Sequence, residues 1–435
     1  MFFESAFILF GLFVVLVTFG VPISFAIGLA TAACIAQTMN PQQAAFIVAQ
    51  RIGIGLDSFT LLAIPFFILA GNIMNRGGIA RRMIEFAKVL AGRLPGALAH
   101  CNILANMMFG SISGSAVAAA AAVGGIMSPL QKKEGYDPAF SAAVNAASCP
   151  TGSLIPPSAP LIVYSLVSGG TSVATLFVAG YIPGVLMGVS AMVVATIIAK
   201  KRGYPLMEKP TFKEAVYKAA DAILPLLLVV IIMGGIVGGL FTATEASAVA
   251  VAYTFLLAVF LYKEVKLSEV PAIIQESAVT TAIVLLLIGC SIGMSWAMAF
   301  SGMPQAFAQA LLTVSDSPLV IMLLINLTLL FIGVFMDLTP AMLIFTPIFL
   351  PAATELGMDP VHFGIMMTFN LCIGVITPPV GSSLFVACSV GGVAIKDILK
   401  PMIPFYAGAL VVLALVTMIP DISLFLPRLL LGYTG

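Results

Sequence analysis

Short polar side chains interrupt four otherwise apolar stretches of this sequence. One stretch contains Ser111, Ser113 and Ser115, and another contains Asp337 and Thr339. Hydroxyl and carboxylate oxygens are hard donors, which suit a cation such as Na⁺ better than they suit a soft metal. These residues therefore predict cation binding. The alternatives are helix packing for the serines, because small polar residues often join membrane helices, and helix capping for the carboxylate of Asp337.

The other two stretches each contain a Pro-Pro pair, within segments 152–158 and 374–383. In lipid, a helix is interrupted only where protein or a watery cavity can pair the freed backbone groups. The helix ends at such a break present carbonyl oxygens to a cation and N–H groups to an anion. The candidate ligands at the two breaks are Gly152, Ser153, Pro156, Ser158, Gly374, Thr377, Gly381 and Ser383.

The composition indicates that lipid is the main solvent of the chain. Of 435 residues, 61% are hydrophobic and 9% are charged, against about a quarter charged in a soluble domain. The net charge of +1 and the scattered basic clusters argue against nucleic-acid binding. The six cysteines lie singly in apolar runs and the two histidines lack a partner cluster, so we assign no metal or catalytic chemistry to them. We expect an all-α polytopic membrane protein.

Apolar runs of helix length predict straight membrane spans. The predicted spans are 5–20, 22–38, 57–75, 171–199, 219–240, 245–262, 272–300 and 402–420. Regions 98–129 and 317–350 are apolar but broken in their middles, which predicts re-entrant hairpins. Regions 138–168 and 360–390 contain the Pro-Pro pairs and are predicted to be broken helices.

Basic residues orient the chain in the membrane. Segment 200–218 is rich in Lys and Arg, whereas 301–318 and 351–360 contain neither. By the positive-inside rule, the first segment is cytoplasmic and the other two face outward. We therefore expect a multi-pass inner-membrane protein.

The second half of the chain repeats the first at an offset of 222 positions. The offset superposes Pro129, Gly135, Asp137, Pro138, Gly152, Pro156, Pro157, Gly169 and Gly170 on Pro351, Gly357, Asp359, Pro360, Gly374, Pro378, Pro379, Gly391 and Gly392. Lys132 precedes the Asp-Pro helix start in the first copy only, and Lys396 follows the Gly-Gly turn in the second only. This reversal of charge predicts two inverted-topology repeats. The alternative is chance matching in a chain rich in glycine and proline.

These elements divide the chain into alternating scaffold and transport segments. The predicted segments are 1–97 (scaffold and a first amphipathic arm at 79–93), 98–170 (first hairpin and broken helix), 171–316 (scaffold, cytoplasmic connector 200–218 and a second arm near 303–313), 317–392 (second hairpin and broken helix) and 393–435 (C-terminal helix).

Four motifs together resemble the large membrane subunit of tripartite ATP-independent periplasmic (TRAP) transporters, within the ion transporter superfamily. The motifs are segment 110–115, the break at 152–158, the run that begins at Thr242 and the run that begins at Asp337. The resemblance covers essentially the whole chain. It implies a separate small four-helix membrane subunit, a periplasmic substrate-binding protein that delivers a small organic anion, and an elevator movement driven by two or more Na⁺.

The resemblance also assigns sites. It implies one Na⁺ held by Ser111, Ser113, Gly152, Ser153, Pro156 and Ser158, a second held by Asp337, Thr339, Gly374, Thr377, Gly381 and Ser383, and substrate between them. The second copy has Asp337 in place of Ser115 and Val380 in place of Ser158. The two cation sites are therefore expected to differ chemically.

The expected function is secondary active transport and not catalysis. The resemblance implies uptake of a carboxylate-bearing solute, with an acidic sugar such as sialic acid preferred and a C4-dicarboxylate next. One alternative is a stand-alone Na⁺- or H⁺-coupled carrier of organic anions from the same superfamily. A membrane hydrolase is the other, but it would need a nucleophile and a base, and the serines have no His or Lys near them in sequence.

Overall fold

The computed structural model describes residues 2–207, 211–314 and 317–435, and these residues form helices and turns but no strand. Eight of the described helices are long and apolar enough to cross a membrane. The predicted connector 200–218 and the outward turn 301–318 lie partly outside the described residues. In chain order the helices are α1 (Phe2–Thr18), α2 (Ile23–Ile35), α3 (Pro41–Leu56), η1 (Phe59–Leu62), α4 (Ala63–Arg76), α5 (Ile79–Ala91), α6 (Ala97–Ser113), α7 (Ala116–Lys133), α8 (Pro138–Ser148), α9 (Thr151–Leu154), α10 (Ala159–Val167), α11 (Val173–Arg202), α12 (Phe212–Val237), α13 (Ala243–Phe255), η2 (Leu256–Leu261), η3 (Leu267–Glu269), α14 (Val270–Phe300), α15 (Met303–Val314), α16 (Pro318–Phe335), α17 (Leu338–Glu355), α18 (Pro360–Gly374), α19 (Ser382–Gly391), α20 (Ile395–Met418) and α21 (Asp421–Leu431).

Helix α3 is absent from the predicted spans. Its polar residues, including Gln50 and Arg51, lower the local hydropathy and conceal it from a search for apolar runs. A capping signal was nevertheless present, because Asn40 precedes Pro41 and its side chain accepts a hydrogen bond from the Gln43 amide at 2.8 Å. The Arg51 guanidinium lies over the Trp296 ring of α14, 4.7 Å from the ring centroid.

The helices break within the regions where the sequence predicts hairpins and broken helices. Helices α6 and α7 are joined at Gly114, which has a φ of 62° and so occupies the left-handed region that glycine tolerates. The first broken helix is α8 and α9 followed by α10, and the second is α18 followed by α19. The Asp-Pro starts are confirmed, because Asp137 and Asp359 accept hydrogen bonds from amides in the first turns of α8 and α18.

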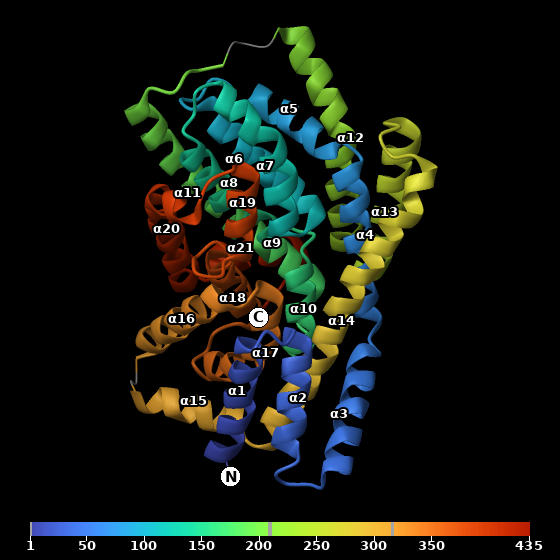
Figure 1. Cartoon of the computed structure of the whole chain (residues 1–435), viewed down its shortest axis with the longest axis vertical. Coiled ribbons are helices and arrows are strands. Elements are labelled where there is room, and N and C mark those ends of the chain that lie inside the picture. Colours follow the sequence, from blue (N-terminus) through green and yellow to red (C-terminus); the bar gives the residue numbers. More distant parts are fainter. Residues whose placement is uncertain (1, 208–210, 315–316) are drawn as a thin grey trace.

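Element boundaries recur at the offset of the sequence repeat. Helix α7 starts and ends 222 positions before α17. The same offset separates the start of α8 from that of α18, and the start of α11 from that of α20. The peptide bonds Pro156-Pro157 and Pro378-Pro379 are both cis and are separated by the same offset. The pair α6 and α7 lies in the upper half of Figure 1 and the pair α16 and α17 in the lower half, while α5 and α15 lie at opposite ends of the long axis.

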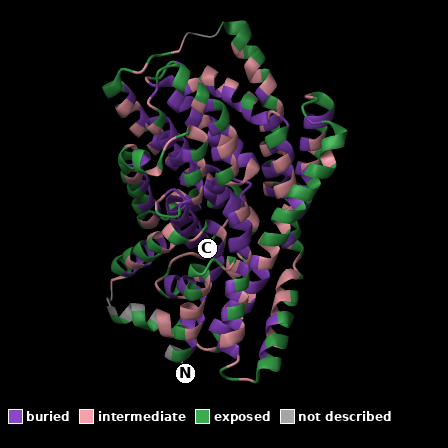
Figure 2. Cartoon of the chain, in the orientation of Figure 1, coloured by how far each residue is buried: buried purple, intermediate pink, exposed green. Residues whose placement is uncertain are grey.

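The helices pack in two groups. A core group contains α6 to α11 and α16 to α21, and an outer group contains α1 to α4 and α12 to α14. The arms α5 and α15 contact both groups: α5 packs on α6 and α12, and α15 packs on α17 and α14. Buried residues concentrate in the hairpins and broken helices, whereas the flanking helices have exposed outer faces (Figure 2). Helix α11, whose residues 173–202 lie in a segment predicted as scaffold, packs against α6, α8, α9, α18, α20 and α21. This helix is apolar on all sides, so its sequence pattern gave no information on its neighbours.

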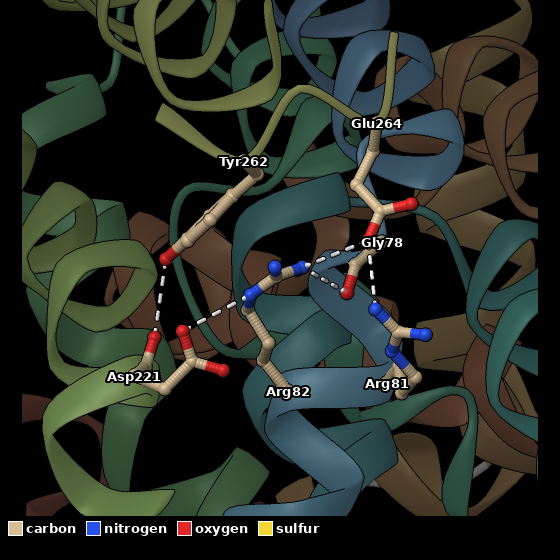
Figure 3. Close-up of polar contacts among 6 residues, drawn as sticks. All are labelled: Gly78, Arg81, Arg82, Asp221, Tyr262 and Glu264. Atoms are coloured by element: carbon tan, nitrogen blue, oxygen red, sulfur yellow. Dashed lines mark hydrogen bonds and ion pairs between the residues drawn. The ribbon is translucent and has the colours of Figure 1, made fainter. Parts of the chain in front are cut away.

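The amphipathic arm α5 is fastened to the outer group by charge. The Arg82 guanidinium lies 3.5 Å from the centroid of the Tyr262 ring, and its Nε donates to Asp221 Oδ1 of α12 at 3.2 Å (Figure 3). Arg81 donates to Glu264 Oε1 at 2.7 Å. Helix α5 also packs on α6 of the first hairpin. The arm thus connects the two groups of helices.

Candidate functional site

A cavity of about 320 Å³ lies where the two halves of the core group meet the outer group. The first half contributes Gly114, Ser115, Ala116, Val117, Ser153, Ala159, Pro160 and Val163, the second half contributes Asp337, Leu338, Thr339, Val375 and Ser383, and the outer group contributes Ile64, Ile68, Thr280 and Val284. Among the described residues of this lining, Asp337 is the only charged one. The remaining wall is apolar or carries hydroxyls.

The first turns of four helices face this cavity. Ala116 and Ala159 begin α7 and α10, whereas Leu338 and Ser383 belong to the first turns of α17 and α19. The N-terminal end of a helix has unpaired N–H groups and a partial positive charge, so it attracts an anion. Four such ends in one cavity can bind a carboxylate without a lysine or arginine in the lining.

The first hairpin and the first break touch through their backbones. A Cβ atom added to Gly110 would lie 2.5 Å from Gly152 Cα, and one added to Gly152 would lie 2.4 Å from Gly110 Cα. Only glycine allows this approach. It places the tip serines beside the break, where the buried Ser113 hydroxyl has no hydrogen-bond partner among the described residues.

A hydrogen bond from one of the predicted ligands stabilises the first break. Ser158 is fully buried, and its hydroxyl donates to the Ser153 carbonyl oxygen at 2.5 Å. The Ser111 hydroxyl donates to the Met108 carbonyl oxygen of its own helix at 2.8 Å. Both hydroxyl oxygens keep lone pairs after donating, so these bonds are compatible with cation binding.

The second half has a corresponding contact between glycines. A Cβ atom added to Gly374 would lie 2.6 Å from Gly333 Cα. At the break, the Thr377 hydroxyl donates to the Ile373 carbonyl oxygen at 2.6 Å, and the Gly381 amide donates to the Thr377 carbonyl oxygen at 3.1 Å.

Asp337 is at the N-cap position of α17 but makes no side-chain capping bond there. Its Oδ1 instead accepts a hydrogen bond from Ser382 Oγ at 3.0 Å. The neighbouring Ser383 hydroxyl is buried beside the Cys149 thiol, without a hydrogen bond of good geometry. The geometry therefore disfavours capping as the role of Asp337 and leaves it exposed toward the second break.

The structure brings four of the predicted site residues into the cavity wall: Ser153, Asp337, Thr339 and Ser383. The others, Ser111, Ser113, Gly152, Pro156, Ser158, Gly374, Thr377 and Gly381, lie outside that lining. Among the described residues there is no cluster of three or more His, Cys, Asp or Glu side chains that could hold a metal ion. The available donors are hydroxyl, carbonyl and single carboxylate oxygens, which are ligands for a hard cation.

Two further hydroxyls line the cavity. Ser115 belongs to the serine cluster that the sequence singled out at 111–115, although it was not assigned as a ligand, and it also caps α7, where it accepts from the Ala118 amide at 3.3 Å. Thr280 faces the cavity from α14. Its position within a long apolar span gave no signal, because a hydroxyl there can bond to its own helix, as Thr280 does to the Glu276 carbonyl oxygen at 3.0 Å.

Buried asparagines join each hairpin to its broken helix. Asn106 of α6 donates to Asn145 Oδ1 at 3.0 Å and to Ser148 Oγ at 2.7 Å, both on α8. In the second half, Asn370 of α18 donates to Asn326 Oδ1 of α16 at 2.8 Å. Such bonds fix the register of the packed helices, because a buried amide left unpaired is costly. No local sequence pattern marks these residues.

Comparison with known proteins gives consistent matches. Residues 10–422 match the family model described as "Tripartite ATP-independent periplasmic transporter, DctM component". The chain is 56% identical over 422 residues to the uncharacterized protein YgiK of Salmonella typhimurium, covering 97% of each chain. It is 41% identical over 414 residues to the sialic acid TRAP transporter large permease protein SiaM of Vibrio cholerae, covering 95% of this chain and 96% of the relative.

A solved structure also resembles the chain. The YdaH transporter of Alcanivorax borkumensis superposes with a TM-score of 0.58 and 14% sequence identity, covering 87% of this chain and 88% of that one. At this identity the likeness shows a common fold only.

Proposed function

The chain belongs to the DctM component family of TRAP transporters, and from this premise we propose that it is the large permease of a Na⁺-coupled importer of a carboxylate-bearing solute. One observation carries the proposal: the first turns of α7, α10, α17 and α19 converge on a single cavity, and Asp337 is the one charged residue in its described lining. Backbone N–H groups bind the carboxylate of the solute, and hydroxyls orient the rest of it.

Na⁺ binds beside the substrate at two sites that differ in chemistry. The first uses Ser111, Ser113 and the break at 152–158, where the glycine contact and the unpaired Ser113 hydroxyl support it. The second uses Asp337, Thr339 and the break at 374–383, where the Asp337 carboxylate supplies a negative charge. A cation close to Asp337 also reduces the repulsion between that carboxylate and an anionic substrate.

Transport proceeds by movement of the core group against the outer group. The two-group packing and the position of the cavity between the groups support this elevator mechanism. The offset of element boundaries and the opposite positions of α5 and α15 support inverted repeats. A small four-helix membrane subunit enlarges the outer group, and a periplasmic binding protein delivers the substrate to the inner membrane.

The substrate we favour is an acidic sugar such as sialic acid, with a C4-dicarboxylate second. The named sialic acid relative supports the first choice. The cavity also contains several hydroxyls, from Ser115, Ser153, Thr280, Thr339 and Ser383, which match a polyhydroxylated solute.

Uptake assays in proteoliposomes test the proposal. Each charge that crosses 100 mV contributes about 2.3 kcal/mol, so two Na⁺ with one monovalent anion give electrogenic uptake. We expect uptake to need an inward Na⁺ gradient and to increase with a negative interior. Indifference to both would contradict the proposal. Full activity without the binding protein would instead support the stand-alone carrier.

A further inference from the structure

A second cavity, of about 780 Å³, lies among α8, α11 and α20, away from the site described above. Its charged lining residues are Asp137, Lys201, Arg202, Asp397 and Lys400. Helices α11 and α20 both have the length and apolar character of membrane spans. Lys201 is in the last turn of α11, and Lys400 is five residues from the start of α20. The cavity therefore lies where two spans reach an interface between lipid and water.

The basic residues of this cavity differ in whether they form an ion pair. Arg202 forms one, because its Nη1 donates to Asp137 Oδ2 at 2.5 Å, and it also donates to the Tyr204 hydroxyl at 3.2 Å. Lys201 and Lys400 are exposed and make no ion pair in the described part of the chain. Asp397 is in the first turn of α20, where the helix end favours a carboxylate. The three basic side chains and two carboxylates of the lining give it a net charge of +1, which can attract an anionic ligand.

An exposed apolar stripe leads to Lys201 along α11. Val185, Val189, Val193 and Ile197 follow one another at intervals of four residues and are 43% to 62% exposed. Lys201 continues the same interval. Residues four apart lie on one helix face, and the stripe is about 18 Å long at about 1.5 Å per residue. One leaflet of the hydrocarbon core is about 15 Å thick, half of about 30 Å, so the stripe spans one leaflet and ends at a cation.

We propose that this cavity binds an anionic phospholipid, with its phosphate between Lys201 and Lys400 and one acyl chain along the stripe on α11. Basic pockets between membrane helices recognise such headgroups, and each lysine attracts an anionic lipid independently of the other. The cavity walls belong to the core group, so the lipid accompanies that group when it moves. The inference does not depend on which solute is transported.

Lipid titration of the purified full-length chain in neutral detergent tests this site. Bound lipid is counted by native mass spectrometry for phosphatidylglycerol and phosphatidylethanolamine, and thermal shifts are measured with phosphatidylglycerol and with inorganic phosphate. The double variant Lys201→Gln/Lys400→Gln should bind phosphatidylglycerol about thirtyfold more weakly than the natural chain. The matched control Lys132→Gln/Lys133→Gln removes two exposed lysines outside the cavity and should bind as the natural chain does. Ile197→Ser, which interrupts the stripe, should weaken binding severalfold without changing the charge.

Four results would overturn the proposal. The first is equal binding of phosphatidylglycerol by the cavity double variant and the natural chain, and the second is equal weakening in the Lys132/Lys133 control. The third is an affinity of the natural chain for phosphatidylethanolamine that equals its affinity for phosphatidylglycerol. The fourth is a thermal shift with inorganic phosphate as large as that with phosphatidylglycerol. The Ile197→Ser variant keeps both lysines, so it gives an independent answer if the double variant does not fold.

Discussion

The hydroxyl of Ser382 donates a hydrogen bond to Asp337 Oδ1 at 3.0 Å, which joins the tip of the second hairpin to the helix that follows the second break. Both residues stand at helix N-termini, where a partial positive charge favours the carboxylate. No equivalent carboxylate exists in the first half, since Ser115 occupies the corresponding position. Asp337 is therefore the residue that distinguishes the two halves of the cavity.

Asp337→Asn tests the second Na⁺ site. The amide keeps a hydrogen-bond acceptor for Ser382 but removes the charge that attracts the cation. We expect the Na⁺ concentration for half-maximal uptake to rise about tenfold or more, equivalent to about 1.4 kcal/mol. Glu245→Gln, in the capping box of α13 and outside the cavity, is the matched control. An unchanged Na⁺ dependence in Asp337→Asn would exclude this residue as a ligand.

Gly152→Ala tests the backbone contact at the first break. The added Cβ would lie 2.4 Å from Gly110 Cα, so the hairpin tip must move away. We expect a loss of about 1–3 kcal/mol of stability and a stronger loss of uptake. Gly125→Ala, an exposed position of α7 with no atom within 4 Å of the new Cβ, should be neutral or stabilising by up to about 1 kcal/mol. Thermal unfolding and uptake are the measurements, and equal behaviour of the two variants would refute the steric argument.

Arg82→Lys tests the fastening of arm α5 to the outer group. Lysine retains the charge but cannot reproduce the planar stacking on Tyr262 together with the bond to Asp221. The Arg82 side chain is 11% exposed, so we expect a loss of about 1–3 kcal/mol in thermal unfolding. Arg81→Ala should cost less than about 1 kcal/mol, because that side chain is 59% exposed. Equal losses would show that burial does not determine the strength of this contact.

Acid should weaken the link between α5 and α12 through Glu85. Burial raises the pKa of this carboxyl, but hydrogen bonds from Lys88 at 2.5 Å and Lys218 at 2.9 Å outweigh burial and hold its pKa below 4.5. A carboxyl whose pKa is lower in the folded chain than in the unfolded chain stabilises the fold at pH values above its unfolded pKa of 4.5. This stabilisation is lost as the pH falls through the folded pKa. The thermal midpoint should therefore fall more steeply below pH 4.5 in the natural chain than in Glu85→Gln. Parallel pH profiles would contradict this assignment.

The sequence predicted the features that have strong local causes. Helix breaks at the Pro-Pro pairs and helix starts at Asp137 and Asp359 follow from the lost amide donor of proline and from capping by aspartate. The tips were found because serine, glycine and aspartate are conspicuous in apolar surroundings. These features located four residues of the cavity wall.

Features that depend on packing between distant helices could not be predicted from the sequence. The grouping of α11 with the hairpins arises from contacts with distant helices, and an evenly apolar helix does not reveal its partners. Thr280 reaches the cavity because α14 packs against α17 of the second half. The asparagine pairs Asn106 with Asn145 and Asn326 with Asn370 lie 39 and 44 residues apart, beyond the range of local patterns.

The opposite orientation of the two halves is the claim on which the cavity and its ligands depend. Single cysteines at Lys132 and Thr354, at the ends of α7 and α17, test it in intact spheroplasts with a membrane-impermeant maleimide. All six natural cysteines are buried, so their background labelling should be low. The account predicts labelling of Thr354→Cys from outside and of Lys132→Cys only after the membrane is opened. Labelling of both positions from the same side would contradict it.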